Sequence, residues 1–159
     1  MAQETSSAIT IQQVELLSPE AQALIAALNA ELSSIYPEQG ATHFRLDPDE
    51  VADGQGAFLV ATRAANPVGC GAVRRIDARI GEIKRMYVAP EERGRGLSRL
   101  LLDELESEAR ALGLSRLVLE TGIRQLAALA LYEKAGFSRI DPFGEYVDSP
   151  LSVCMAKDQ

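Results

Sequence analysis

Residues 78–122 constrain the fold more than any other part of the chain. The run "ARIGEIKRMYVAP" has the alternation of a strand that stops at Pro90, and "LSRLVLETG" is a second strand-like run. Between them, apolar residues at spacings of three and four predict an amphipathic helix whose other face is acidic. A strand, a helix and a strand in this order form a right-handed parallel crossover within one sheet.

The predicted helix after Pro90 ends near Gly113, a candidate C-terminal cap. Its other face carries Asp103, Glu104, Glu106 and Glu108. Its apolar face is formed by Leu97, Leu100, Leu101, Leu105, Ala109 and Leu112.

The rest of the chain extends this unit into a mixed α/β (α+β) sheet with helices on its faces. Ser18 as N-cap and Pro19 at the first position predict a helix over residues 19–35, and "DPDE" at 47–50 has a capping-box pattern for a short second helix. Strands are predicted in "AITIQQVELL", in two runs joined at Asn66-Pro67, in "FSRI" and in "PLSVCMAK". A further helix is predicted in "IRQLAALALYEKAG".

Length and charge bound the class of protein. At 159 residues and 17.2 kDa we expect a single domain over residues 8–159 after a flexible tail of residues 1–7. The formal net charge of −7 argues against nucleic acid as a partner. No apolar run approaches a membrane span and no signal segment is evident, which predicts a cytoplasmic protein without membrane partners. Cys70 and Cys154 lie far apart in apolar stretches, so we expect buried thiols and no metal site.

The stretch "ERGRGLSR", residues 92–99, has the features of an anion site. A strand that turns through glycines into a helix start presents unpaired backbone N–H groups and the positive end of the helix dipole. Gly94 and Gly96 leave room for a phosphate, Ser98 adds a hydroxyl, and the neighbouring arginines add charge. The Gly-Lys-Ser/Thr of a Walker loop is absent, and Arg99 stands where a dinucleotide fingerprint needs its third glycine. A polyanionic ligand of another kind is therefore predicted.

Three separated motifs occur in a familiar order: "GEIKRMYVAPEERGRGLSRLLLDEL", "LVLETG" and "ALALYEKAGF". Together they resemble the Gcn5-related N-acetyltransferase (GNAT) superfamily, whose signature Arg/Gln-x-x-Gly-x-Gly/Ala has Arg93, Gly96 and Ser98 at its positions here. The resemblance is strong over residues 56–140. It implies one N-acetyltransferase domain with a mostly antiparallel sheet of six or seven strands, one splayed parallel pair and about four helices.

The resemblance also implies the co-substrate, acetyl-CoA, and where it binds. The pyrophosphate would lie on the amides of the loop and first helical turn, and pantetheine would lie along a bulged central strand like an added strand. The Val88 N–H would be the oxyanion donor. Gln125 stands where many relatives have an asparagine that holds pantetheine. The expected coenzyme-binding residues are Met86, Tyr87, Val88, Arg93, Gly94, Arg95, Gly96, Leu97, Ser98, Arg99, Gln125, Ala128 and Tyr132.

Two proton-transfer roles follow from the resemblance. Tyr132 in "LYEKAGF" would be the general acid for the coenzyme thiolate, either by transferring its proton or by holding a hydrogen bond. Glu82 matches the base of the histone-modifying branch of the superfamily. The other interpretation of Glu82 is a structural glutamate paired with Lys84 or Arg79.

The acceptor is predicted less specifically. Arg74, Arg75 and Arg85 are candidate carboxylate-binding cations, with His43 and Tyr146 as further pocket residues; the alternative is that these arginines pair with acidic neighbours. We expect a small amine that carries a carboxylate, acetylated by direct attack in a ternary complex. A protein N-terminus or lysine as acceptor, and a non-catalytic acyl-CoA sensor, are the alternatives. Relatives often form homodimers, but no residue here indicates a dimer surface.

Overall fold

The computed structural model describes residues 8–38 and 46–159. The predicted tail of residues 1–7 and the candidate His43 lie outside the described residues. The elements are β1 (Ile9–Gln13), α2 (Pro19–Ile35), η1 (Pro48–Val51), β2 (Gly56–Arg63), β3 (Asn66–Arg75), β4 (Ile80–Val88), η2 (Pro90–Glu92), α3 (Leu97–Ala111), β5 (Arg116–Gly122), α4 (Leu126–Lys134), β6 (Ser138–Ile140), η3 (Gly144–Tyr146) and β7 (Ser152–Asp158), where η marks a short 3-10 helix.

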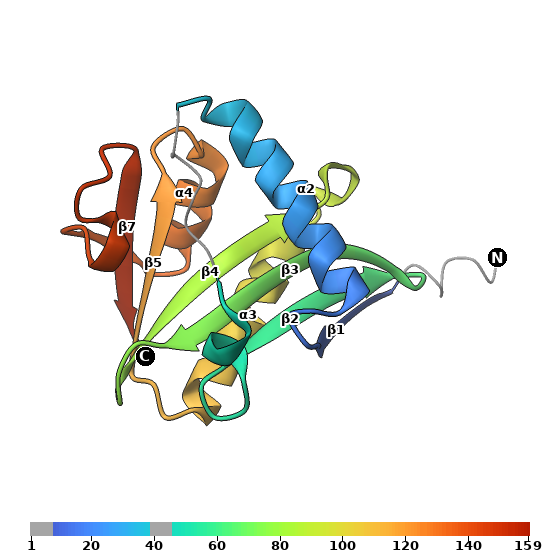
Figure 1. Cartoon of the computed structure of the whole chain (residues 1–159), viewed down its shortest axis with the longest axis horizontal. Coiled ribbons are helices and arrows are strands. Elements are labelled where there is room, and N and C mark those ends of the chain that lie inside the picture. The colour runs from blue at the N-terminus through green and yellow to red at the C-terminus, as the bar shows by residue number, and fades with distance from the viewer. Residues whose placement is uncertain (1–7, 39–45) are drawn as a thin grey trace.

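The strands form one seven-stranded sheet in the order β1-β2-β3-β4-β5-β7-β6 (Figure 1). Every neighbouring pair is antiparallel except β4 and β5, which are parallel and joined through α3. This confirms the predicted mixed sheet and its crossover.

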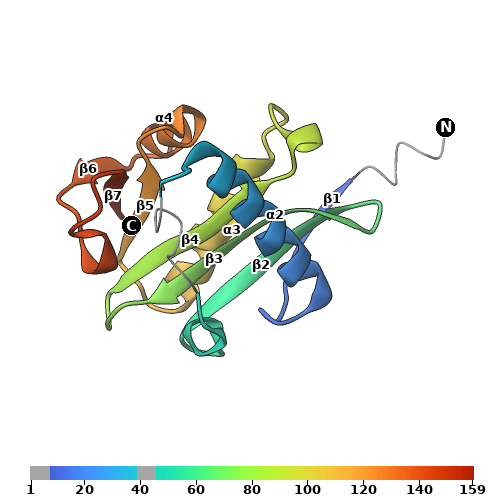
Figure 2. The same cartoon turned by 45° about the horizontal axis from the view of Figure 1, so that its top comes forward.

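The helices cover both faces of the sheet, with α2 across one face and α3 across the other (Figures 1 and 2). One core lies under α3 and α4 and contains Leu101, Leu105 and Phe137; a second lies under α2 and contains Leu24, Phe58 and Tyr87. Within residues 8–38 and 46–159, no helix is both long enough and apolar enough to cross a bilayer.

The helix starts and stops follow the capping residues of the sequence. The Ser18 hydroxyl accepts a hydrogen bond from the Ala21 amide at 3.4 Å, and η1 has the predicted capping box between Asp47 and Glu50. Gly113 follows α3 with a φ of +81°, the left-handed conformation that glycine adopts readily.

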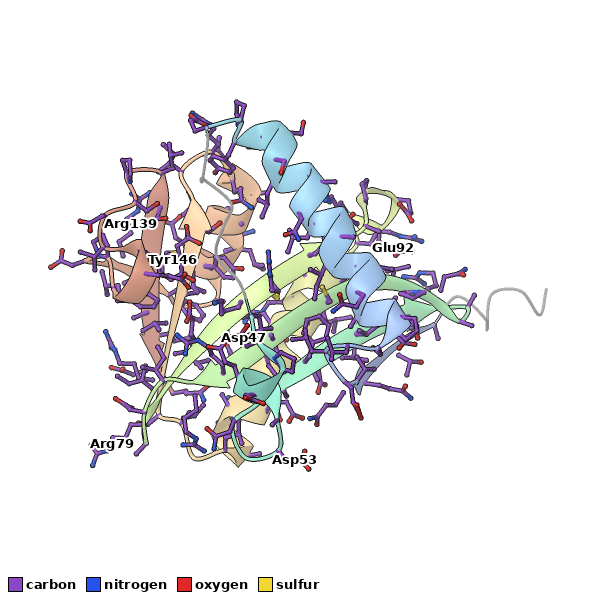
Figure 3. All side chains as sticks on the ribbon, viewed as in Figure 1. Asp47, Asp53, Arg79, Glu92, Arg139 and Tyr146 are labelled. Atoms are coloured by element: carbon purple, nitrogen blue, oxygen red, sulfur yellow. The ribbon has the colours of Figure 1, made fainter. Side chains whose placement is uncertain are left out.

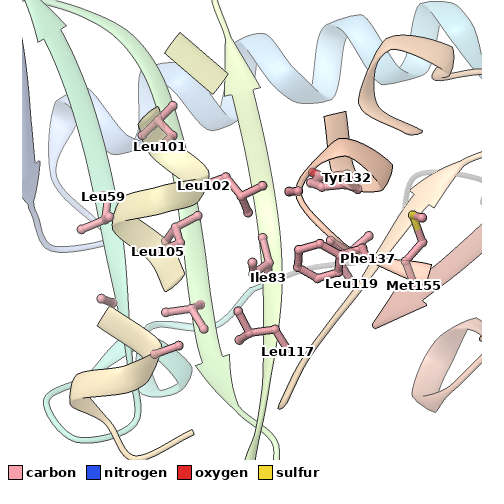
Figure 4. Packing of buried hydrophobic residues seen from close by; sticks show 14 of the residues in the cluster. Leu59, Ile83, Leu101, Leu102, Leu105, Leu117, Leu119, Tyr132, Phe137 and Met155 are labelled. Carbon is pink, nitrogen blue, oxygen red and sulfur yellow. The ribbon is translucent and has the colours of Figure 1, made fainter. Parts of the chain in front are cut away.

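The buried face of α3 differs from the predicted one at three positions. Leu102 is fully buried, whereas the predicted core residue Leu100 is 48% exposed. Glu106, predicted on the polar face, is buried and paired with Lys157 of β7 at 3.0 Å. Leu102 packs near Ile83 of β4 (Figure 4). The buried stripe of α3 is therefore rotated toward Leu102 from the predicted one.

Two predicted boundaries were also wrong. The β2–β3 turn lies at Ala64-Ala65, both with positive φ, instead of at Asn66-Pro67, which belong to β3. The last predicted helix starts at Leu126 instead of Ile123, because the Gln125 side chain accepts a hydrogen bond from the Gly122 amide and closes a turn before the helix.

The parallel pair splays, as the resemblance implied. Strands β4 and β5 pair only from Ile80–Ile83 to residues 116–119, and beyond Leu119 they diverge (Figure 1). On the other edge of β4 the register with β3 shifts between Cys70 and Ala72. Arg85 lies inside this shift with a φ of +60°, so an extra residue bulges the strand where the two strands part. A wedge therefore opens at the carboxyl ends of β4 and β5.

Candidate active site

A cleft of about 530 Å³ fills the wedge between β4 and β5. Its walls come from α2, the end of β4, the loop before α3, the end of β5, α4 and the segment before β7. The predicted site residues that line it are Arg85, Met86, Tyr87, Val88, Arg93, Gly94, Gly96, Leu97, Ser98, Gln125, Ala128, Tyr132 and Tyr146. These predicted residues share one cleft, and the role of each stays a prediction.

The loop before α3 offers a row of unused amide donors. Helix α3 starts at Leu97 with Gly96 as its N-cap, no side chain caps it, and its first turn contains no acid. In the described part of the chain, the N–H groups of residues 94–99 donate to no acceptor. Gly94 and Gly96 have φ values of +76° and +84°, and a Cβ at either position would meet open space. Such donors, together with the positive end of the helix dipole, are of the kind that binds anions.

The arginine side chains of this loop are bound to acidic residues and to a backbone carbonyl of the protein, so none of them is an unpaired charge in the cleft. Arg93 donates to the Val88 carbonyl at 2.9 Å and to Glu31 of α2 at 2.6 Å. Arg95 pairs with buried Glu92, which also binds Arg63, and Arg99 pairs with Asp103 one turn along α3. Arg95 and Arg99 do not line the cleft with their side chains. The charge that the sequence suggested for a ligand is therefore largely neutralised by acids, which leaves the main-chain amides as the main anion donors.

The free edge of β4 faces the cleft at Val88. The Ala89 amide donates to the Val68 carbonyl of β3 at 2.8 Å. Since successive amides of a strand point to opposite edges, the Val88 N–H points away from β3, to the side that β5 has left. The Val88 N–H can therefore donate into the cleft.

Tyr132 enters the cleft from α4. Its ring packs edge-on against Phe137, with 5.8 Å between ring centroids, beside Leu119 of β5 (Figure 4). Its hydroxyl makes no hydrogen bond to any residue that the structure describes, and the residue lines the cleft. Burial, and secondarily the charge of Glu120, raise the pKa of Tyr132 well above its usual value. The phenol therefore stays protonated at neutral pH.

Glu82 lies behind the cleft wall, which differs from the predicted position of a base. Its carboxylate is 1% exposed, binds the Arg74 guanidinium at 2.8 Å and accepts the Tyr146 hydroxyl at 2.6 Å. Glu82 does not line the cleft, whereas Tyr146 does. Its ion-pair partner is Arg74, and not Lys84 or Arg79, the two cations that the sequence analysis considered.

The three candidate carboxylate-binding arginines separate in the fold. Arg74 forms ion pairs with Glu82 and Glu50. Arg75 donates hydrogen bonds to the backbone carbonyls of Gly54 and Leu112. Neither arginine lines the cleft. Only Arg85 does, and its guanidinium donates to the Asn29 amide oxygen at 3.0 Å. Among residues 8–38 and 46–159, no carboxylate lies within ion-pair distance of it. Burial lowers the pKa of Arg85 from its ordinary value, though the group remains a cation.

Tyr36 and Glu120 are among the cleft residues that the sequence analysis missed. Tyr36, at the end of α2, lies so close to Gly122 that a Cβ there would collide with its hydroxyl, and this hydroxyl accepts the Arg124 amide at 3.0 Å. Glu120 is the first residue of β5 beyond its pairing with β4, and it lines the cleft. Its signal was an acidic residue at the carboxyl end of a parallel strand, where ligand sites gather in such sheets.

The bulged strand, the splayed parallel pair and the open row of amides define an acyl-coenzyme A transferase type of fold and site. Residues 21–137 match the Acetyltransferase (GNAT) family. The chain is 43% identical to the IAA acetyltransferase of Azospirillum brasilense over 151 residues, which are 94% of this chain and 97% of that protein. The chain belongs to the GNAT family.

Solved structures agree with this assignment. A putative acyl-CoA N-acyltransferase from Klebsiella pneumoniae is 36% identical, with a TM-score of 0.80 and coverage of 96% of this chain and 98% of that chain. A GNAT family acetyltransferase from Elizabethkingia anophelis, crystallised with acetyl-CoA, shares the fold at 20% identity, with a TM-score of 0.69 and coverage of 95% and 98%. The chain is an N-acetyltransferase of the kind that uses acetyl-CoA, as the resemblance implied.

Proposed function

We propose that this enzyme acetylates the primary amine of a small molecule that carries a carboxylate. The observation that carries the proposal is Arg85, a cation on the cleft wall whose guanidinium has no carboxylate partner among the described residues. A planar guanidinium binds a carboxylate through two parallel hydrogen bonds, so it would fix both the identity and the orientation of such an acceptor.

The coenzyme would occupy the other half of the cleft. The amides of residues 94–99 suit its diphosphate, and the free edge of β4 at Met86 and Val88 suits the amide groups of pantetheine. Ala128 and Leu97 line the same wall. Gln125 lines it too, but its side-chain oxygen is held by the Gly122 amide, so its free NH₂ group is what remains for pantetheine.

Acetyl-CoA supplies an activated acetyl thioester in this reaction. The Val88 N–H would stabilise negative charge on the acyl oxygen, a role that is worth roughly 3 kcal/mol in other acyl-transfer sites. Tyr132 would hold and protonate the leaving sulfur. With its pKa raised by burial, Tyr132 is a weak acid, so a hydrogen bond to the thiolate carries more of its effect than early proton transfer.

A small acceptor is supported by the relative whose name gives IAA as its acceptor. It is also supported by the geometry, because Leu28, Leu32 and Tyr36 of α2 and its C-cap line the acceptor side, and the segment after α2 is tied to the β5–α4 turn by the Arg124–Glu38 ion pair at 2.6 Å. A peptide acceptor would need an open groove on this side. A cytoplasmic location and a homodimer remain predictions.

The test is a thiol-release assay with acetyl-CoA and matched acceptors. We expect turnover with amines that carry a carboxylate and at least tenfold lower kcat/KM with their amide or decarboxylated analogues. Arg85→Ala should abolish this preference, and Arg79→Ala, an exposed arginine at the far end of β4 (Figure 3), should keep it. Turnover with peptides alone, or acetyl-CoA binding without turnover on any amine, would overturn the proposal.

A further inference from the structure

Arg124 lies in the turn between β5 and α4 and contacts the end of α2 through both its side chain and its backbone. Its guanidinium forms a two-pronged pair with the Glu38 carboxylate, at 2.9 and 2.6 Å. The same guanidinium donates to the Ile35 carbonyl at 3.1 Å and lies over the Tyr36 ring, 5.0 Å from the ring centroid. The Arg124 amide donates to the Tyr36 hydroxyl at 3.0 Å. Arg124 therefore binds the last residue of α2 and two residues of the segment that follows.

The sequence of α2 explains why a cation from another element binds there. Residues 32–35, the last turn of the helix, read Leu-Ser-Ser-Ile and contain no cation of their own. The last carbonyls of a helix have no partner within it, and a cation near them also meets the negative end of the helix dipole. The planar guanidinium of Arg124 reaches one such carbonyl and both oxygens of Glu38 together, which the point charge of a lysine cannot do.

Helix α2 is held on both sides of the wedge between β4 and β5. On the β4 side, the Asn29 side chain accepts a hydrogen bond from Arg85 at 3.0 Å, and Glu31 accepts one from Arg93 at 2.6 Å. On the β5 side, the contacts of Arg124 hold the end of the helix, which lies beside α4 (Figures 1 and 2). Helix α2 therefore bridges the two strands where they diverge.

The bridging part of α2 is also a wall of the cleft. Leu32, Ile35 and Tyr36 line the cleft from this side, and Arg124 lines it from the β5–α4 turn. The position of this wall relative to β5 fixes how much room an acceptor has beside Arg85. Because Arg124 makes the contacts that hold the wall on the β5 side, it controls that room without meeting the thioester.

We propose, on the basis of the proposed function, that Arg124 is a positioning residue that sets the size of acceptor the enzyme takes. With the end of α2 held against the β5–α4 turn, the pocket is closed and fits amines of limited length. With the end of α2 released, the wall can move away from β5 and longer amines fit. The groups that act on the thioester stay the same in both cases.

The test measures kcat/KM for a series of amino acids with linear apolar side chains of increasing length. We expect the wild type to discriminate sharply along the series, and the ratio of kcat/KM between short and long members to fall about tenfold in Arg124→Ala. The change should lie in the acceptor KM, with kcat within about threefold of wild type. Arg124→Lys, which keeps the charge but loses the planar fork, should lie between the two.

Arg116→Ala is the matched control. Arg116 lies at the other end of β5, its side chain is about as exposed as that of Arg124, and it pairs with Asp158 at 2.8 Å. This variant should keep the size preference of the wild type. Hydrogen exchange measures the attachment directly, because the amides in the last turn of α2 should exchange about tenfold faster in Arg124→Ala and at the wild-type rate in Arg116→Ala.

Binding and melting measurements separate this role from a purely structural one. Both alanine variants should bind acetyl-CoA as the wild type does and melt within about 3 °C of it, because exposed ion pairs add little stability. An active wild type whose size preference and α2 exchange rates persist in Arg124→Ala overturns this inference alone, as does an equal loss of kcat/KM on every acceptor. A wild type that acetylates no amine of the series overturns the proposed function.

Discussion

At the scale of single residues, Tyr132 places in the cleft a hydroxyl group that makes no hydrogen bond within the described part of the protein. Its ring is buried against Phe137, but its hydroxyl bonds to none of the described residues. Core tyrosines normally find a partner for this group, so an unused hydroxyl that faces a cleft indicates a ligand contact.

Tyr132→Phe should therefore lower kcat by about 10²-fold while acetyl-CoA affinity stays within twofold. The free energy of unfolding should change by less than about 0.5 kcal/mol, because no internal hydrogen bond is lost. Thiol release, calorimetric titration and urea unfolding measure the three quantities. An unchanged kcat over the whole pH range would remove Tyr132 as the acid.

At the scale of elements, the two ends of α3 offer a matched comparison. Gly96 and Gly113 flank the helix, have φ values of +84° and +81°, and both have open space around the Cα. A side chain at either position meets the same backbone strain, roughly 1–2 kcal/mol. Only Gly96 lies at the amide row of the cleft.

Gly96→Glu should weaken acetyl-CoA binding by more than a hundredfold, because bulk and negative charge occupy the diphosphate site. Gly113→Glu should lose similar stability and keep its affinity. Titration calorimetry on both variants checks this. Equal affinities in the two variants would place the diphosphate elsewhere.

The elements also mark what the sequence could predict. The crossover around α3 followed from periodicity and capping residues that act over a few positions, as did the helix start at Ser18 and the cap at Gly113. The rotated face of α3 could not be predicted in this way, because buried Glu106 pairs with Lys157, which lies fifty-one residues away in the sequence. The same holds for the site: Gly94, Gly96 and Tyr132 sit in local motifs, whereas the commitment of Glu82 to Arg74 and Tyr146 depends on pairing across the sheet.

At the scale of the whole molecule, α3 packs across β2, β3 and β4 beside the wedge. Leu102 is fully buried near Ile83, at the point where β4 and β5 part, and Leu100 on the same helix is 48% exposed. The contacts of Leu102 therefore stabilise the sheet next to the cleft.

Leu102→Ala should lower the free energy of unfolding by about 2–5 kcal/mol, since it leaves a cavity in a closed core. Leu100→Ala should change it by less than about 0.5 kcal/mol. Chemical denaturation of both variants gives the comparison. A larger loss for Leu100→Ala than for Leu102→Ala would mean that the helix faces the sheet with the stripe predicted from its sequence.

The central claim is that the amides of residues 94–99 hold the diphosphate of acetyl-CoA at the mouth of the β4–β5 wedge. The most direct measurement is a titration of ¹⁵N-labelled protein with acetyl-CoA, followed through the amide resonances. We predict large, saturable shifts at Gly94, Gly96 and Ser98 and none at Gly54 or Gly113. Saturation of the protein with unmoved resonances at residues 94–99 would contradict the account.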